Sequence, residues 1–250
     1  MKIFFLGTNG WFSTKEGSTP CIAIAIRERL IVLDAGDGIA KLAPLMKRLG
    51  LKRADIFLSH MHLDHSAGLH MLMRLPKGAR IRVFVHKGYL PALKRLVARP
   101  YTVSPRELLS KVSFHPLKAG ESRLPYKAIM LPLAHADQCF GFCFSLDGKE
   151  IAYCTDTGPC GNFGKIARNA DLLITECTLL PGERSNPVWP HLSPEMAARE
   201  AKKAGAKRLV LTHFDATKYD AAKLRSRAQS AARRIFPRTL AARDGMEIGI

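Results

Sequence analysis

The stretch "LSHMHLDHSAGL", residues 58–69, places three histidines and an aspartate within six positions, directly after an apolar run. His60 and His62 are two residues apart, and Asp64 and His65 follow at once. Such tight spacing cannot lie on one face of a helix, where neighbours are three or four residues apart, so it is typical of a loop just beyond a strand. Imidazole and carboxylate groups are ligands for Zn²⁺, Mn²⁺, Fe and Co. We therefore interpret the stretch as a metal-binding loop, with a chance cluster of surface histidines as the alternative.

Apolar runs with strand character recur along the whole chain, and helical patterns lie between some of them. This alternation, mixed with hairpin-like runs, predicts an α/β sandwich. The predicted strands are 2–7, 21–26, 30–36, 55–60, 81–86, 128–135, 140–146, 151–157, 172–178 and 208–214. The predicted helices are 39–49, 67–75, 88–97, 163–169, 194–204 and 221–236, with Ser193 as the N-cap of the fifth.

Two segments, 41–62 and 195–215, follow the same order of helix, glycine, basic residues, strand and a hydroxyl residue before a histidine. The histidines are His60 and His213, so each emerges where an apolar strand leaves the core. No low-complexity linker divides the sequence. We expect one domain over residues 1–250, built from two similar halves with a boundary near 120–130.

The composition is that of a soluble globular protein, with 47% hydrophobic and 24% charged residues. No apolar run is long enough to span a membrane, and "MKIFFLG" reads as a first strand and not as a signal peptide. A cytoplasmic location is the default expectation. The six cysteines form no Cys-x-x-Cys pair, so we expect reduced, packed thiols.

The formal net charge is +18, and the segment from Arg199 to Arg243 holds thirteen Lys and Arg residues against three acidic ones. A field of this sign favours anionic partners such as nucleic acid, nucleotides or phosphate esters. A solvated basic surface, as in heat-adapted proteins, is the alternative.

The segment "SHMHLDH" resembles the His-x-His-x-Asp-His signature of the metallo-β-lactamase superfamily, and further elements of that family follow in the expected order. They are "LIVLDAG" with Asp34, "LPLAH" with His135, "YCTDT" with Asp156 and "LVLTH" with His213. The resemblance implies an αβ/βα four-layer sandwich of two mixed β-sheets flanked by helices. It also implies that His60, His62 and His135 hold one metal ion, that Asp64, His65 and His213 hold another, and that Asp156 bridges them.

Two divalent ions about 3.5–4 Å apart can share a water, lower its pKa towards neutrality and stabilise both the attacking and the departing oxygen. The expected reaction is therefore hydrolysis by a metal-bridging hydroxide, which Asp64 would also orient. The expected cofactors are two divalent ions, Zn²⁺ first, with Mn²⁺, Fe or Co as alternatives. Asp34 is expected to support the metal loop as a structural carboxylate.

Within the superfamily, the opening "MKIFFLGTNG" and the ending "ARDGMEIGI" resemble the ribonuclease Z and phosphodiesterase branch. "LLITECT" and "WPHLSPEM" resemble two of its catalytic segments, which places Glu176 at the branch's glutamate and His191 at its second catalytic histidine. In that branch the histidine, oriented by the glutamate, protonates the leaving alkoxide. A capping or solvent-exposed histidine beside Pro190 is the alternative for His191.

Departures from the branch argue against ordinary tRNA 3′ processing. Only 21 positions separate His135 from Asp156, which leaves room for a hairpin but not for the long tRNA-binding arm. The loop "STKEGS" keeps Lys15, and Asp215 stands where a serine is usual. The usual arginine after it is lacking, and Lys218 lies nearby in the sequence. Lys15 and Lys218 are the candidate substrate-binding residues.

The leading hypothesis is a dinuclear metal phosphodiesterase related to ribonuclease Z, with an anionic phosphodiester or RNA as substrate and no membrane partner. A lactonase or β-lactamase-like hydrolase of carboxylic esters or amides is the second hypothesis, since the same hydroxide attacks carbonyl groups. A basic RNA-binding protein with structural metals is the third. Dimers are common among such relatives, so a homodimer is a further expectation.

Overall fold

The computed structural model describes residues 1–250, except the side chain of Arg123, and it divides into two compact units. Unit 1 comprises residues 1–8, 18–118 and 244–249, and unit 2 comprises residues 9–17, 119–243 and 250. The prediction of one domain over the whole chain stays a prediction.

Unit 1 contains a mixed sheet whose described strands run in the order β16-β1-β3-β4-β5-β6-β7. The pairs from β16 to β4 are antiparallel, and those from β4 to β7 are parallel. Nearly all residues of the central strands β3, β4 and β5 are buried, as expected for strands covered on both faces. The strands are β1 Lys2–Gly7, β3 Cys21–Ile26, β4 Arg29–Leu33, β5 Arg53–Phe57, β6 Arg80–His86, β7 Lys111–Leu117 and β16 Glu247–Gly249.

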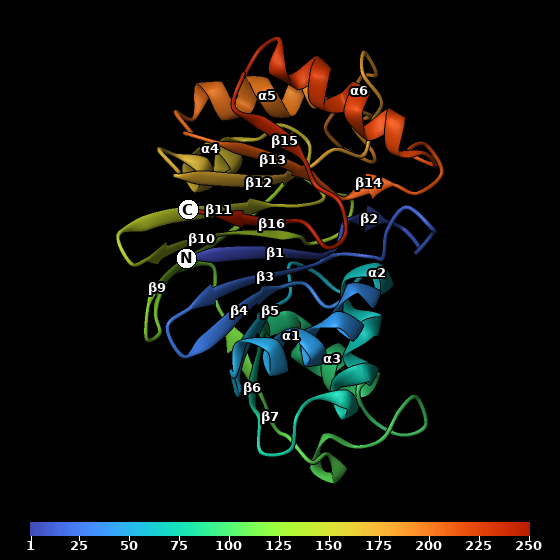
Figure 1. The fold of residues 1–250 in the computed structure, drawn as a ribbon, viewed down its shortest axis with the longest axis vertical. Helices are drawn as coiled ribbons and strands as arrows, with labels where there is room; N and C mark the ends of the chain where they lie inside the picture. The colour runs from blue at the N-terminus through green and yellow to red at the C-terminus, as the bar shows by residue number, and fades with distance from the viewer. The chain divides into compact units, whose positions relative to one another are not determined.

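The helices of unit 1 pack against this sheet through one apolar core (Figure 1). Leu45 and Met46 of one helix and Leu93 of another share that core with strand residues. The helical segments are η1 Asp37–Lys41, α1 Leu42–Leu49, α2 Leu63–Ser66, η2 Ala67–Arg74, η3 Lys87–Tyr89, α3 Leu90–Leu96 and η4 Pro105–Glu107.

The predicted helix 67–75 is wrong in type, because η2 is a 3₁₀ helix. The segment follows the four-residue helix α2 directly and carries Gly68 in its first turn. A Cβ at Gly68 would lie 2.2 Å from the carbonyl oxygen of Gly36, so the backbone is pressed against the loop after β4. The local packing overrides the apolar period of the sequence.

Unit 2 contains a second mixed sheet, with described strands in the order β15-β13-β12-β11-β10-β9-β8, and a short pair of β2 with β14. Strands β8 to β11 are antiparallel, and β11, β12, β13 and β15 are parallel. The strands are β2 Asn9–Gly10, β8 Gly120–Arg123, β9 Lys127–Pro132, β10 Phe140–Leu146, β11 Lys149–Cys154, β12 Leu172–Glu176, β13 Leu209–Thr212, β14 Phe214–Asp215 and β15 Thr239–Ala241.

Three helices pack against this second sheet: α4 Gly161–Ala167, α5 Pro194–Lys203 and α6 Ala222–Arg233 (Figure 1). They share one apolar core with it, to which α6 contributes Ala228 and Ala232. Ser193 caps α5 as predicted, because its side chain accepts a hydrogen bond from the backbone N–H of Met196 at 3.4 Å. The segment between His135 and Asp156 holds the β10–β11 hairpin, in agreement with the predicted lack of an arm.

The repeated order of the two segments is confirmed within each unit. Helix α1 ends at Gly50 and α5 is followed by Gly205, and these glycines have φ angles of 66° and 71°. This left-handed backbone is the usual way to end a helix with glycine. Strand β5 then leads to Ser59 and His60, and β13 leads to His213.

The predicted fold class, two mixed sheets flanked by helices, is confirmed. All six cysteines are free thiols, as expected, and five of them are buried. Across the described residues, the structure has no helix with the length and apolar character needed to cross a bilayer.

Candidate metal-binding and catalytic residues

Three predicted functional residues stand within two positions of the end of a buried strand, in the left-handed backbone region. Asp34 follows β4 with φ 58°, Asp156 follows β11 with φ 46°, and His213 follows β13 with φ 51°. Asp and His are among the residues that tolerate this conformation, but it still carries strain. Strained residues cluster at functional sites, so this shared geometry supports a functional role at each strand end.

Asp34 anchors the metal loop within unit 1, as predicted. Its buried carboxylate accepts hydrogen bonds from the backbone N–H of Ser59 at 2.7 Å and from the Ser59 hydroxyl at 2.9 Å. The Nδ1–H of His65 donates to its other oxygen at 2.8 Å. This bond fixes the ring and leaves Nε2 of His65 available to a cation.

Ser59 orients the ring of His60 in a similar way. The single hydroxyl proton of Ser59 is donated to Asp34, and the Ser59 oxygen lies 3.0 Å from Nδ1 of His60. His60 Nδ1–H therefore donates to Ser59, which leaves the Nε2 lone pair to bind a cation. A ligand atom of His60 and one of His62 lie within 4.8 Å of each other.

Asp64 completes the group of candidate ligands in unit 1. Its Oδ2 lies 3.3 Å from Nε2 of His65, the ring nitrogen that does not contact Asp34. A proton on Nε2 or a cation bound beside both atoms satisfies this contact. The donor set of this loop, imidazole nitrogens and a carboxylate, therefore fits a divalent metal ion.

Unit 2 repeats this arrangement around His213. The hydroxyl of Thr178 donates to the carbonyl oxygen of His213 at 3.3 Å, so its oxygen accepts from Nδ1–H of the same residue at 3.3 Å. The other ring nitrogen of His213, Nε2, lies 3.0 Å from Oδ1 of Asp156, a contact that a proton on Nε2 or a shared cation satisfies. His135 offers a ligand atom within 4.8 Å of one of Asp156.

Glu176 and His191 form a buried pair in unit 2. Glu176 Oε1 lies 2.7 Å from Nδ1 of His191, and the side chains are 0% and 16% exposed. Three backbone N–H groups also donate to the Glu176 carboxylate, those of Thr157 at 2.6 Å, Thr178 at 3.1 Å and Leu192 at 3.2 Å. This geometry favours the predicted pair over a solvent-exposed histidine.

The electrostatics of the pair stabilise a protonated His191. Burial alone would lower the pKa of His191, but the charge of Glu176 and its hydrogen bond raise that pKa to about 9. Burial would likewise raise the pKa of Glu176, yet the charge of His191 and the hydrogen bond hold it below its usual value. The stability that this ion pair contributes is present below pH 6.5, the ordinary pKa of histidine, and is lost as the pH rises through about 9.

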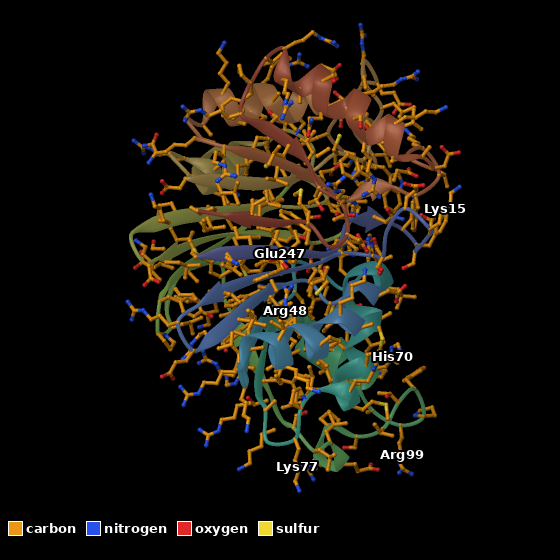
Figure 2. The ribbon with its side chains drawn as sticks, viewed as in Figure 1. Lys15, Arg48, His70, Lys77, Arg99 and Glu247 are labelled. Carbon is orange, nitrogen blue, oxygen red and sulfur yellow. The ribbon has the colours of Figure 1, made fainter. Side chains whose placement is uncertain are left out.

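The two candidate substrate-binding lysines lie in unit 2. Lys15 is exposed in the loop that follows β2 (Figure 2). Lys218 has its Nζ 2.6 Å from Oε2 of Glu183. Asp215 closes its own turn by accepting from the backbone N–H and the hydroxyl of Thr217 at 2.8 and 2.6 Å. The substrate roles of Lys15 and Lys218 stay predictions.

Ser59 and Thr178 were missed as functional residues from sequence. Each fixes the orientation of a histidine that is a candidate ligand. Ser59 had a signal, because it stands directly before His60 after an apolar strand. Thr178 had none, since its contact with His213 joins residues 35 positions apart.

Replacing Asp34 tests the anchor. Asp34→Ala is expected to lower the free energy of unfolding by about 3 kcal/mol, because three buried donors lose a charged acceptor, and to weaken zinc binding by about 10- to 100-fold. Asp34→Asn is the matched variant, since asparagine keeps the left-handed backbone. Chemical unfolding of the chelated protein and competitive zinc titration provide the measurements. Wild-type values for both variants would contradict the anchoring role.

The sequence is similar to known proteins of one superfamily. The family model described as "Beta-lactamase superfamily domain" matches residues 29–214. The ribonuclease Z of Acaryochloris marina is 28% identical, with 86% of each chain covered. The ribonuclease Z of Methanothermobacter thermautotrophicus is 24% identical over 100% of this chain and 97% of its own.

Solved structures share the fold over the whole chain. The metallo-beta-lactamase fold protein YhfI from Bacillus subtilis superposes with a TM-score of 0.81 at 20% identity, covering 99% of this chain and 98% of its own. The short form of human tRNase Z gives a TM-score of 0.75 at 23% identity, covering 100% and 99%.

Proposed function

Because the chain belongs to the beta-lactamase superfamily, we propose that it is a metal-dependent phosphodiesterase that uses His191 to protonate the leaving oxygen of its substrate. The chain is a hydrolase of the metallo-β-lactamase fold related to ribonuclease Z, as the sequence predicted. The proposal concerns the finer reaction, its substrate and its residues.

The observation that carries the proposal is the Glu176–His191 pair. A ribose or alkyl oxygen leaves poorly as an anion, so its departure needs a proton donor. Glu176 holds Nδ1 of His191 at 2.7 Å and favours the protonated ring. The proton on Nε2 of His191 is then the one that can be transferred. Opening a lactone also releases an alkoxide, so the preference for the phosphodiester over the lactone hypothesis comes from the net charge of +18 and from the ribonuclease Z relatives.

We propose the predicted residues as metal ligands: His60, His62, Asp64 and His65 of unit 1, and His135, Asp156 and His213 of unit 2. The hydrogen bonds at Nδ1 of His60, His65 and His213 leave Nε2 of each ring available to a cation, which supports this assignment. Two divalent ions, Zn²⁺ first, would supply an activated water and positive charge for the phosphoryl oxygens. Asp34, Ser59 and Thr178 would hold the ligand rings in their binding orientation.

The basic composition supports an anionic substrate, and the named relatives support RNA among the candidates. The shortened segment between His135 and Asp156 and the altered "STKEGS" loop favour a substrate other than precursor tRNA. A cytoplasmic location and a homodimer stay predictions. If the chain were instead a basic RNA-binding protein with structural metals, it would bind RNA without turnover.

Metal reconstitution tests the proposal. Protein freed of metal by chelation is expected to lose hydrolysis of bis(p-nitrophenyl) phosphate and to regain it with about two equivalents of Zn²⁺ or Mn²⁺. A panel of lactone, thioester and β-lactam substrates runs in parallel, together with precursor tRNA that carries a 3′ trailer. Turnover of a lactone far above that of every phosphodiester, unaffected by His191→Ala, would contradict the proposal.

A further inference from the structure

The chain contains two tryptophans, and one of them, Trp189, lies next to the proposed catalytic residues. Trp189 is 47% exposed and Val188 beside it is 68% exposed. An indole left in water forgoes the large stabilisation that its burial would give. Aromatic residues that remain exposed beside functional groups are often the anchors of a binding site.

Trp189 is held in position by the loop that carries it. The loop between Leu179 and Leu192 is closed by a hydrogen bond from the N–H of the first to the carbonyl of the second at 3.1 Å. Inside it, Ser185 accepts from the backbone N–H of His191 at 3.1 Å. Pro190 packs against Gly158, where an added Cβ would lie 2.7 Å from the Cβ of the proline. These contacts hold the loop, and with it the backbone of Trp189, in a defined position.

The neighbours of Trp189 within unit 2 are the proposed functional histidines. Its ring lies 6.0 Å from the ring of His135 at 74°, an edge-to-face contact. The rings of His135 and His191 lie 5.6 Å apart. A substrate group that reaches His191 therefore comes close to the exposed indole.

We propose that Trp189 forms a stacking subsite for a nucleobase, so that the phosphodiester bond served by His191 belongs to a nucleotide or an RNA. This inference rests on the proposed phosphodiesterase function and narrows its substrate class. Every nucleobase has a planar π-face, and indoles bind such faces by stacking with little dependence on sequence. The net charge of +18 attracts the phosphate that accompanies the base.

Fluorescence gives a readout that does not depend on turnover. Trp11→Phe leaves Trp189 as the sole tryptophan. AMP is expected to quench its emission with saturation, when excitation is at the red edge of the indole band, where adenine does not absorb. Ribose 5-phosphate, which lacks the base, is expected to leave the emission unchanged. A short oligoadenylate that saturates at lower concentration than AMP would identify RNA as the source of the base. No quenching by any of the three, or equal quenching by ribose 5-phosphate, would overturn the proposal.

Steady-state kinetics provide a second test of the proposed nucleobase subsite. Trp189→Ala is expected to raise KM for the p-nitrophenyl ester of thymidine 5′-phosphate about tenfold, and to leave KM for methyl p-nitrophenyl phosphate unchanged. Trp189→Phe should restore most of the affinity, and Tyr101→Ala, which removes an aromatic residue 67% exposed in unit 1, is the matched control. An equal effect on both esters would overturn the nucleobase subsite. A wild-type enzyme that hydrolyses neither ester would instead overturn the proposed function, while the fluorescence titration still tests the subsite.

Discussion

Asp64→Ala is expected to lower kcat/KM for bis(p-nitrophenyl) phosphate by at least about a thousandfold. Asp64 has two proposed roles, as a metal ligand and as the group that orients the attacking water. Its side chain is only 8% exposed, and its Oδ2 lies 3.3 Å from Nε2 of His65. The substitution removes the carboxylate from beside Nε2 of His65, so bound zinc should fall together with activity. Steady-state kinetics and metal analysis on the same preparations measure both effects.

The matched control is Asp37→Ala, because Asp37 is an exposed aspartate of the same unit in the short helix η1. It should retain wild-type kinetics and metal content. If Asp64→Ala kept nearly full activity with its full complement of metal, the assignment of the metal loop would be wrong. Thermal unfolding of each variant separates loss of function from loss of fold.

His191→Ala is expected to lower kcat by about 10²- to 10⁴-fold for a diester with an alkoxide leaving group. A substrate that releases p-nitrophenolate needs no proton donor, and its turnover should fall far less. This contrast between leaving groups is the signature of a general acid, which a purely structural histidine would not produce. His70→Ala is the control, since His70 is an exposed surface histidine (Figure 2).

Glu176→Gln tests the positioning of that acid. In the chelated protein, the imidazole of His191 is expected to titrate near pH 9 by nuclear magnetic resonance. Without the charge of Glu176, the burial of His191 should lower its pKa from about 9 towards its ordinary value. An unchanged titration in this variant would show that Glu176 does not control the proton of His191.

The core strands could be predicted from sequence, and the sheet edges could not. Strands such as β3 and β12 are short, continuous apolar runs, which are typical of buried strands. Of the missed strands, β7, β8, β15 and β16 each lie at an end of a sheet order, and β2 belongs to the short pair with β14. Strand β7 reads "KVSFHPL", with polar residues and a proline, so its extended form depends on pairing with β6.

The candidate ligands of unit 1 could be predicted because the motif places all four of them, three histidines and an aspartate, within one short stretch. The orientation of each ring could not, since it depends on contacts that are distant in sequence, such as Asp34 with His65 and Thr178 with His213. The left-handed backbone at the strand ends also carried no sequence signal, because aspartate and histidine occupy ordinary conformations elsewhere.

That backbone conformation has a consequence for the evolution and engineering of the chain. At Asp156 and His213, glycine would relieve roughly 1 kcal/mol of backbone strain at each position, whereas at Asp34 the loss of the buried hydrogen bonds outweighs that gain. Selection for thermostability alone should therefore favour replacement of the residues that the chemistry requires. In libraries screened for stability, we expect these residues to be replaced early, with loss of activity. In libraries screened for turnover, we expect the same residues to be kept, at the expense of melting temperature. The difference between the two selections would mark the functional residues without a substrate being known.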